Sequence, residues 1–131
     1  MMSRADRLVE CTIPVLPVQD LKRSIAFYTE ILEFRLDWGS GAKDTVCSVS
    51  RDGCAIMLQQ SEVAGTPAWA WIGLEDDSLF DLYASRGVKV KQPPRNFSWA
   101  YEMKFEDPDG NVLWLGTEPK NDLPLEDRQE S

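Results

Sequence analysis

The chain has 131 residues, the size of one domain, and 43% of them are hydrophobic, enough for one sizeable core. Its 22 acidic and 14 basic residues give a formal net charge of −8, which disfavours non-specific binding to nucleic acid or to an anionic membrane and favours a cationic small-molecule ligand. No apolar run approaches the ~20 residues that span a bilayer, and residues 1–10 carry two arginines and two acidic residues where a secretory signal needs an apolar stretch. We therefore expect a soluble cytoplasmic protein with no nucleic-acid and no membrane partner.

The first half of the chain combines strand-like and helix-like patterns. Residues 10–18 form an extended apolar run whose two prolines place it at a sheet edge. Asp20 then stands at a helix N-cap position, and apolar or aromatic residues follow at helical spacing: Leu21, Ile25, Tyr28 and Leu32. Three short strand-like runs, separated by a Gly-Ser-Gly loop and by an Asp-Gly hairpin signal, come next: 34–38, 45–50 and 54–59. The predicted order is β-α-β-β-β.

The same order begins again at residue 68. An apolar run is followed by an acidic helix cap at Asp76 or Asp77, and by a short helix that Gly87 ends. Residues 88–92 are strand-like and a Pro-Pro loop follows. The last two strand-like runs are joined by the tight-turn sequence Asp-Pro-Asp-Gly-Asn: 99–106 and 112–117. Residues 119–131 have few apolar side chains and are predicted to form a flexible, solvated tail.

Two segments of this repeated pattern resemble a known family. The opening strand and helix contain PVLPVQDL and SIAFY, and the final hairpin reads FEDPDGNVLWL. Both are similar to the glyoxalase/bleomycin-resistance (vicinal oxygen chelate) superfamily, and the likeness covers residues 10–118. It implies an α+β domain of two modules, about 10–66 and 67–118, after an N-terminal extension at 1–9. In that family the modules form a curved mixed sheet around a cleft, with the helices on the convex face.

The resemblance also indicates where a metal site would lie. Metal-dependent members hold a divalent ion with His, Gln or Glu at four inward strand positions, which fall here at Pro14, Met57, Trp69 and Trp114. Proline and indole offer no suitable lone pair, a thioether is a soft donor, and the chain has no histidine. We therefore expect no metal and no other cofactor, and none of the isomerase, ring-cleaving or fosfomycin-opening reactions that the superfamily runs through its metal.

Strand alternation indicates which side chains share the cleft with those four positions. Trp71 follows Trp69 on the inward face, and Gln59 follows Met57, while the aliphatic residues between them point towards the helices. The cleft is thus predicted to be lined by indoles and a thioether, which can stack on a planar or cationic ligand. Strand ends and loops add three further aromatic candidates: Trp38, Phe97 and Trp99.

One further strand supplies polar candidates. If Met103 and Phe105 face the helices, then Glu102 and Lys104 turn to the cleft and act as the polar anchors of an apolar pocket. Two simpler interpretations stay open: tryptophans on strands are commonly core residues, and Glu102 with Lys104 can be only a cross-strand or solvated charge pair.

The resemblance is strongest in character to the bleomycin-resistance proteins, which lack the metal ligands, stack an aromatic antibiotic in a cleft and work as homodimers. We predict a metal-free homodimeric protein, with no catalytic residue, that sequesters a planar and, from the net charge, cationic aromatic ligand. Two enzymatic alternatives stay open. One is a metal-free enzyme with Glu102 as general base beside Lys104; the other is a glyoxalase-like lyase, isomerase or dioxygenase that holds a divalent ion through carboxylates.

Overall fold

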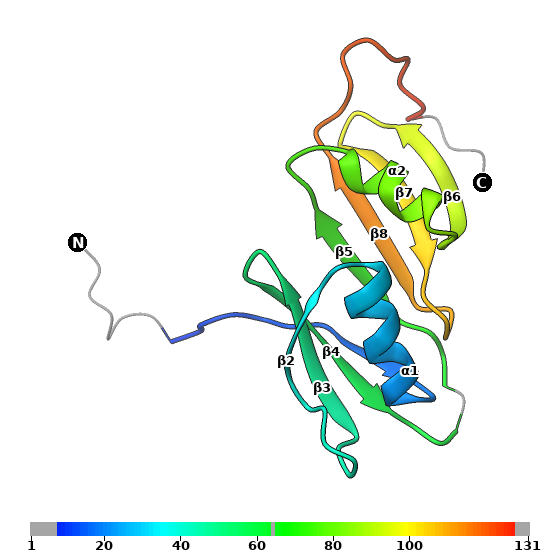
Figure 1. Ribbon diagram of the computed structural model, residues 1–131. Coiled ribbons are helices and arrows are strands. Elements are labelled where there is room, and N and C mark those ends of the chain that lie inside the picture. The colour runs from blue at the N-terminus through cyan, green and yellow to red at the C-terminus, as the bar shows by residue number, and fades with distance from the viewer. Residues whose placement is uncertain (1–7, 64, 128–131) are drawn as a thin grey trace.

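The computed structural model describes residues 8–63 and 65–127, and Figure 1 shows two sheet-and-helix modules, one above the other. The first module holds a four-stranded sheet in the spatial order β1 (Val15–Val18), β4 (Cys54–Gln60), β3 (Val46–Arg51) and β2 (Arg35–Trp38). The second holds its counterpart in the order β5 (Trp69–Gly73), β8 (Val112–Thr117), β7 (Tyr101–Glu106) and β6 (Lys89–Asn96). In each sheet the first strand is parallel to the last and the other pairs are antiparallel. The predicted α+β fold of two repeated modules is confirmed, with two separate sheets in place of one continuous sheet.

The described residues contain three helical segments: α1 (Leu21–Ala26), η2 (Phe27–Ile31) and α2 (Ser78–Ser85). The predicted cap of α1 is present, since the Asp20 carboxylate accepts a hydrogen bond from the Arg23 N–H at 3.2 Å. The sequence did not predict that α1 continues into a π-helical turn, in which the N–H of Leu32 reaches the carbonyl of Phe27 at 3.1 Å. A single widened turn leaves the apolar spacing of a helix almost unchanged, so periodicity does not reveal it.

Both predicted hairpin turns are present. Asp52 and Gly53 have positive φ angles of 51° and 80°, as a two-residue hairpin loop requires. In the second turn Gly110 has φ 82°, and its N–H donates to the Asp107 carbonyl at 3.0 Å. These turns fix the registers of β3 with β4 and of β7 with β8.

The core lies between the sheets and the helices. Seven of the apolar strand residues that alternation assigned to the helix side are at most 5% exposed: Ile56, Leu58, Ala70, Met103, Phe105, Leu113 and Leu115. Ile72 and Leu74, assigned to the same side, are partly buried against this core. The helices contribute Leu21, Tyr28, Phe80 and Tyr83 to the same cluster. The opposite face of each sheet therefore carries no helix, and it displays the other set of strand side chains.

A buried polar network joins the two modules. Asp107, which is 5% exposed, accepts hydrogen bonds from the Tyr28 hydroxyl at 2.8 Å and from the Asn111 amide at 2.9 Å. The same Asn111 amide donates to the carbonyl of Pro17 in β1 at 2.8 Å, and its oxygen accepts from the N–H of Ala68 at 2.8 Å. The final hairpin is thereby tied to the first strand and to η2.

Two tyrosine hydroxyls are buried as neutral donors. Tyr28 donates to Asp107, and Tyr83 donates to the carbonyl of Leu32 at 2.8 Å. Burial raises the pKa of Tyr28 well above its ordinary value, with the Asp107 charge adding to the effect. Burial likewise raises the pKa of Tyr83 to about 12.

Alkaline pH is therefore expected to unfold the protein. A group whose folded pKa is raised contributes stability that is fully present below its unfolded pKa, near 10, and that is lost as the pH rises through the folded pKa. For Tyr83 the loss amounts to about 2 to 3 kcal/mol between pH 10 and pH 12. The free energy of unfolding is measured by urea unfolding, followed by circular dichroism, at pH 9, 10, 11 and 12. It should fall less steeply with pH for Tyr83→Phe than for the wild-type protein, and equal slopes for the two proteins would contradict this assignment.

Strand β6 departs from the sequence-based prediction. The prediction ended the strand at residue 92 and continued with a proline loop, whereas the strand includes both Pro93 and Pro94. Its register with β7 shifts between Val90 and Gln92, and again between Gln92 and Arg95. β6 is the outer strand of its sheet, and prolines fit there because no neighbour requires their missing N–H.

The C-terminal segment is attached to the fold. The Asn96 side chain donates to the Lys120 carbonyl at 3.0 Å and accepts from the Lys120 N–H at 2.9 Å. Further along, the Glu126 N–H donates to the Asn96 carbonyl at 2.7 Å. Part of the segment 119–131, predicted as a flexible tail, thus makes these contacts, and its residues 128–131 lie outside the described residues.

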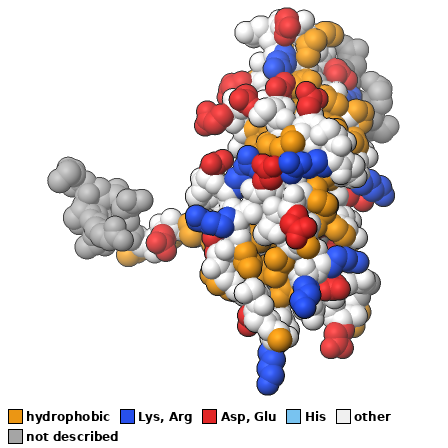
Figure 2. Space-filling view, viewed as in Figure 1, with side chains coloured by type: hydrophobic (Ala, Val, Ile, Leu, Met, Phe, Trp, Pro, Cys, Tyr) orange, Lys and Arg blue, Asp and Glu red, His pale blue; other side chains and the backbone are white. Residues whose placement is uncertain are grey.

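Charged side chains of both signs are interspersed over the face shown in Figure 2. Within the described residues two ion pairs join the modules: Arg86 with Glu33 at 2.6 Å and Arg23 with Asp109 at 3.0 Å. No helix within the described ranges has the length and apolar character needed to cross a membrane.

Candidate functional site

Three tryptophans lie together on the face of the second sheet that is turned away from the helices. Trp71 of β5 stands directly beside Trp114 of β8 in the parallel register, and Trp69 is two residues earlier on β5. The Trp114 ring centroid is 5.7 Å from that of Trp69 and 5.4 Å from that of Trp71, at interplanar angles of 71° and 79°. Trp69 is 51% exposed and Trp71 is 53% exposed. We call this set the tryptophan face; it offers indole surface to a ligand.

Gly116 provides the space for one of these rings. A Cβ atom at this position would overlap the Cη2 atom of the Trp71 indole and would lie 2.8 Å from its Cζ2 atom. The indole of Trp71 therefore lies directly over the backbone of β8. Gly116 was not among the predicted site residues, because its role depends on the pairing between strands and not on alternation along one strand.

Gly116→Ala is expected to displace the Trp71 indole with little effect on stability. The atoms in the way belong to the far end of a side chain that can rotate, so we expect a loss of less than about 1.5 kcal/mol in unfolding free energy. Quenching of tryptophan fluorescence by acrylamide should increase. Gly73→Ala is the matched control, because its Cβ would meet the Trp71 Nε1 at an ordinary 3.5 Å; an equal response in both variants would contradict the assignment.

A lysine lies at the edge of the tryptophan face. Lys104 of β7 pairs in register with Trp114, and its Nζ atom lies 4.5 Å from the Trp114 ring centroid and 5.4 Å from that of Trp69. These are cation–π distances. On its other side Lys104 pairs with Gln92 of β6. The structure thus places Lys104 among the tryptophans, as alternation along β7 indicated.

Gln92, Lys104 and Trp114 stand side by side in the register of three neighbouring strands, and we call them the Lys104 row. Two hydrogen-bond donors in this row have no acceptor within the described part of the chain. They are the Trp114 Nε1 and the Gln92 Nε2, and both atoms are buried. An unpaired buried donor costs about 1 to 3 kcal/mol, so such groups call for a physical explanation. Gln92 was not predicted as a site residue because the sequence placed it at the end of a shorter strand.

Glu102 is the second polar candidate, and it is only 2% exposed. It pairs in register with Gly116 on β8 and with Arg95 on β6. Its Oε2 atom accepts from the Trp99 Nε1 at a long 3.4 Å. Glu102 therefore lies between the strand position that seats Trp71 and the loop that carries Trp99.

The other aromatic candidates of this module form a separate pair. The rings of Phe97 and Trp99 are stacked with centroids 4.6 Å apart and an interplanar angle of 5°. Phe97 is buried, at 3% exposure, whereas Trp99 is 57% exposed. Only Trp99 presents its ring to the outside, and Glu102 connects it to the tryptophan face.

The first-module candidates lie on the other sheet. Met57 is half-buried and pairs with Ser48, while Gln59 and Pro14 are exposed. Trp38 is 51% exposed and also pairs with Ser48, after a register shift in β2. Because the two sheets are separate, the structure does not place these residues in one row with the tryptophans.

A small polar cluster on that first sheet was missed by the sequence reasoning. The Asp37 carboxylate accepts from the Ser48 hydroxyl at 3.1 Å and from the Ser50 hydroxyl at 2.8 Å. Both serines are buried, at 4% and 8% exposure. Period-two alternation along 45–50, opposite Met57, was the signal that could have identified them.

The four positions that the resemblance implies for metal ligands do not fit a divalent ion. Pro14, Met57, Trp69 and Trp114 contribute no carboxylate, imidazole or thiolate. Within residues 8–63 and 65–127 no three His, Cys, Asp or Glu side chains gather into a possible metal site. The face is instead suited to stacking.

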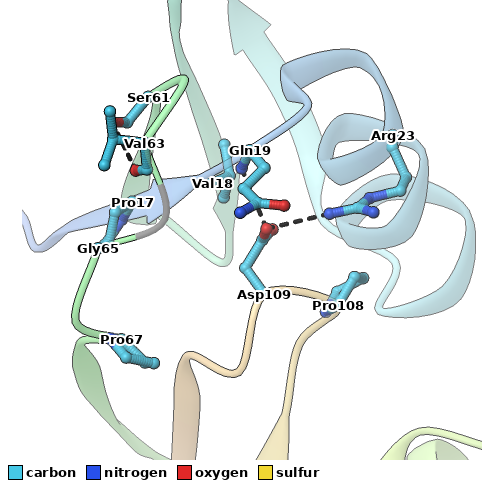
Figure 3. Close-up of a pocket in the computed structure, with 10 residues that line it drawn as sticks. All are labelled: Pro17, Val18, Gln19, Arg23, Ser61, Val63, Gly65, Pro67, Pro108 and Asp109. Carbon is cyan, nitrogen blue, oxygen red and sulfur yellow. Dashed lines mark hydrogen bonds and ion pairs between the residues drawn. The ribbon is translucent and has the colours of Figure 1, made fainter.

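A pocket of about 210 Å³ lies at the junction of the modules (Figure 3), and its lining includes no residue of the tryptophan face. Its polar groups are already paired within the chain: Asp109 accepts from the Arg23 guanidinium and from the Gln19 N–H, both at 3.0 Å. We therefore interpret it as part of the packing between the modules.

Comparison with known proteins places this geometry in a family. The sequence model of the Glyoxalase/Bleomycin resistance protein/Dioxygenase superfamily matches residues 7–115. No curated protein sequence matches the chain.

Solved structures share the fold at low sequence identity. TioX from Micromonospora sp. ML1 has a TM-score of 0.70 and 18% identity, over 82% of this chain and 99% of that one. TnmS3, an antibiotic binding protein from Streptomyces sp. CB03234, has a TM-score of 0.69 and 24% identity, over 87% and 100%. The bleomycin-binding protein from bleomycin-producing Streptomyces verticillus, solved with copper(II)-bleomycin, has a TM-score of 0.66 and 22% identity, over 86% and 100%. With the family match spanning most of its length, the chain belongs to the Glyoxalase/Bleomycin resistance protein/Dioxygenase superfamily.

Proposed function

We propose that this protein binds and sequesters a planar aromatic small molecule on the tryptophan face, without a divalent metal and without catalysis. The observation that carries the proposal is the exposure of Trp69 and Trp71, each more than half, beside Trp114 on a rigid sheet. A single indole buries about 150 to 250 Å² when it is covered, so leaving two of them open forgoes much apolar burial. Contiguous exposed apolar surface of this kind marks a binding site.

The fold neighbours support the same ligand class. One of them is solved with copper(II)-bleomycin and another is described as an antibiotic binding protein. We propose that the ligand here is likewise an antibiotic or a similar planar metabolite, and that the protein protects by holding it.

We further propose that the working unit is a homodimer in which a second copy covers the tryptophan face. Within the described residues the face is open, and strands β1 and β5 each pair on one side only. The helix-free face of the partner's first sheet, with the half-buried thioether of Met57, supplies a suitable wall. Sedimentation equilibrium should give twice the chain mass, and a monomer at micromolar concentration would contradict this part of the proposal.

Fluorescence titration tests the binding function. Full-length protein is titrated with bleomycin and with planar anthraquinone and acridine compounds, and saturable quenching by at least one of them is expected. A parallel thermal-shift series with Mn, Ni, Zn, Co and Fe should show no stabilisation at micromolar metal. Absence of quenching across the panel would overturn the binding function, and clear stabilisation by one of the metals would overturn the metal-free claim.

A metal-free enzyme is the second candidate, and it rests on Glu102. This carboxylate is 2% exposed and accepts a long hydrogen bond of 3.4 Å from Trp99, so it takes a proton from a ligand only when the ligand displaces the Trp71 indole over Gly116 or the Trp99 indole. Glu102→Gln separates the two candidates once a ligand is known. A binder loses only affinity, whereas an enzyme loses turnover.

A further inference from the structure

We infer that the ligand of the tryptophan face carries an anionic oxygen group at the edge of its ring system, a carboxylate or an ionised phenol, and that Lys104 binds this group. The inference rests on the proposed binding function and specifies its ligand class. It replaces the cationic ligand expected from the net charge of the chain.

The strand register leaves Lys104 without an opposite charge on β6. Along β7 the residues on the helix-free side are Glu102, Lys104 and Glu106. Lys89 of β6 stands opposite Glu106 and forms an ion pair with it at 3.4 Å, whereas Lys104 stands opposite the neutral Gln92. Arg95 stands opposite Glu102, but its guanidinium pairs with Glu126 at 3.0 Å.

Within the described residues the neighbouring carboxylates do not pair with Lys104. Glu106 pairs with Lys89 at 3.4 Å and with Lys91 at 3.6 Å, and Glu102 accepts a long hydrogen bond of 3.4 Å from the Trp99 Nε1. In the ranges that the structure describes, no carboxylate lies within ion-pair distance of Lys104, which contacts the Trp69 and Trp114 rings instead. Its ammonium is therefore free to pair with an anion on a ligand.

The distance over which charges act decides whether the Lys104 ammonium or the net charge of −8 determines the charge of the preferred ligand. At physiological ionic strength, exposed charges more than about 8 Å apart are largely screened from each other. The Lys104 ammonium is 4.5 Å from the Trp114 ring centroid, so it lies within contact range of a molecule stacked beside that ring. It also occupies the cation–π position over Trp114, so a cationic ligand would meet a like charge there.

The unpaired donors in the same row strengthen the argument. Trp114 Nε1 and Gln92 Nε2 belong to the two residues that flank Lys104 in the register, one on each side. Both are donors, so what the row lacks is an acceptor. Both donor atoms are buried in the free protein. The flexible four-carbon stem of Lys104 allows its ammonium to move with an incoming oxyanion, and this movement gives the oxyanion access to the two donors.

The test uses three probes that share one ring system and differ in charge. These are anthraquinone-2-carboxylate, the neutral anthraquinone-2-carboxamide and the cationic 2-(aminomethyl)anthraquinone, measured by isothermal titration calorimetry on full-length protein. We expect the carboxylate to bind at least about tenfold more tightly than the carboxamide, as a charge-assisted hydrogen bond provides, and the amine to bind most weakly.

Variants assign the preference to one side chain. Lys104→Met should weaken the binding of anthraquinone-2-carboxylate about tenfold and change the affinity for the carboxamide by less than twofold. Lys104→Arg should retain the preference for the carboxylate. Lys89→Met is the matched control, since Lys89 lies on the neighbouring strand but is paired with Glu106, and it should change neither probe. Thermal melts establish that each variant is folded.

The outcomes separate the two levels of the proposal. If the carboxamide or the amine binds wild-type protein as tightly as the carboxylate, or if Lys104→Met weakens all three probes equally, the anion inference is overturned while the binding function stands. If none of the three binds saturably while bleomycin or an acridine compound does, the anion inference is overturned and the binding function stands. If no compound of the fluorescence panel binds either, the proposed function is contradicted, and the anion inference with it.

Discussion

Asp107→Ala is expected to lower the free energy of unfolding by about 3 to 4 kcal/mol, a large part of the roughly 5 to 15 kcal/mol available to a domain of this size. The carboxylate accepts from the Tyr28 hydroxyl, from the Asn111 amide, and from the backbone N–H groups of Asp109 and Asn111, at 2.8 to 2.9 Å. Removing it leaves these donors buried without an acceptor, each at a cost of about 1 to 3 kcal/mol before relaxation. Urea unfolding at pH 7 measures the loss.

Two further variants make this prediction specific. Asp107→Asn keeps the shape but exchanges one acceptor for a donor, and an intermediate loss of about 1 to 2 kcal/mol is expected. Asp81→Ala removes an exposed aspartate from α2 and should change stability by less than about 0.5 kcal/mol. If Asp107→Ala and Asp81→Ala prove equally stable, the network does not join the modules in the way described.

Trp71→Ala should weaken binding of anthraquinone-2-carboxylate about 10- to 100-fold, in line with the loss of a central aromatic contact in a binding site. The indole lies over Gly116 with one side in contact with Trp114, so its removal takes away stacking surface and also frees the neighbouring ring. Calorimetry is the suitable measurement, because the substitution removes a fluorophore. The fold of the single chain should lose little stability, since Trp71 is more than half exposed within one chain.

Trp99→Ala is the matched comparison for that experiment. Trp99 is as exposed as Trp71, but its ring is stacked on Phe97 and not on the tryptophan face. We expect less than a threefold change in affinity. A larger effect for Trp99 than for Trp71 would move the binding surface to the loop that follows β6.

Much of the fold could be predicted because local patterns determine it. Alternation with period two marked the strands, spacing near 3.6 marked α1, and Asp52-Gly53 and Asp107 to Asn111 gave both turns. The π-helical turn, the extension of β6 through its prolines and the attachment of the C-terminal segment were not predicted. The π-helical turn is a local change in hydrogen bonding that leaves the apolar spacing almost unchanged, whereas the other two depend on pairing with neighbouring segments of the assembled sheet.

The candidate site was predicted along each strand but not across strands. Alternation placed Trp69 and Trp71 on one face, and Lys104 on the same side of its own strand. Which residue stands beside which is a matter of register, and register is set by turns and bulges. The placement of Gln92 opposite Lys104 is a property of the assembled sheet. The charge preference inferred for the ligand could therefore not be obtained from composition.

The attachment of the C-terminal segment has a consequence for how the molecule behaves at high concentration. β6 is an outer strand, and an outer strand with open backbone groups is a template for pairing with another chain. The N–H of Glu126 occupies the Asn96 carbonyl, and the Glu126 carboxylate bonds the Arg95 side chain at 3.0 Å. Glu126 thus covers the end of this outer strand, and shortening the chain after β8 is expected to expose that end to edge-to-edge pairing and to raise the tendency to aggregate.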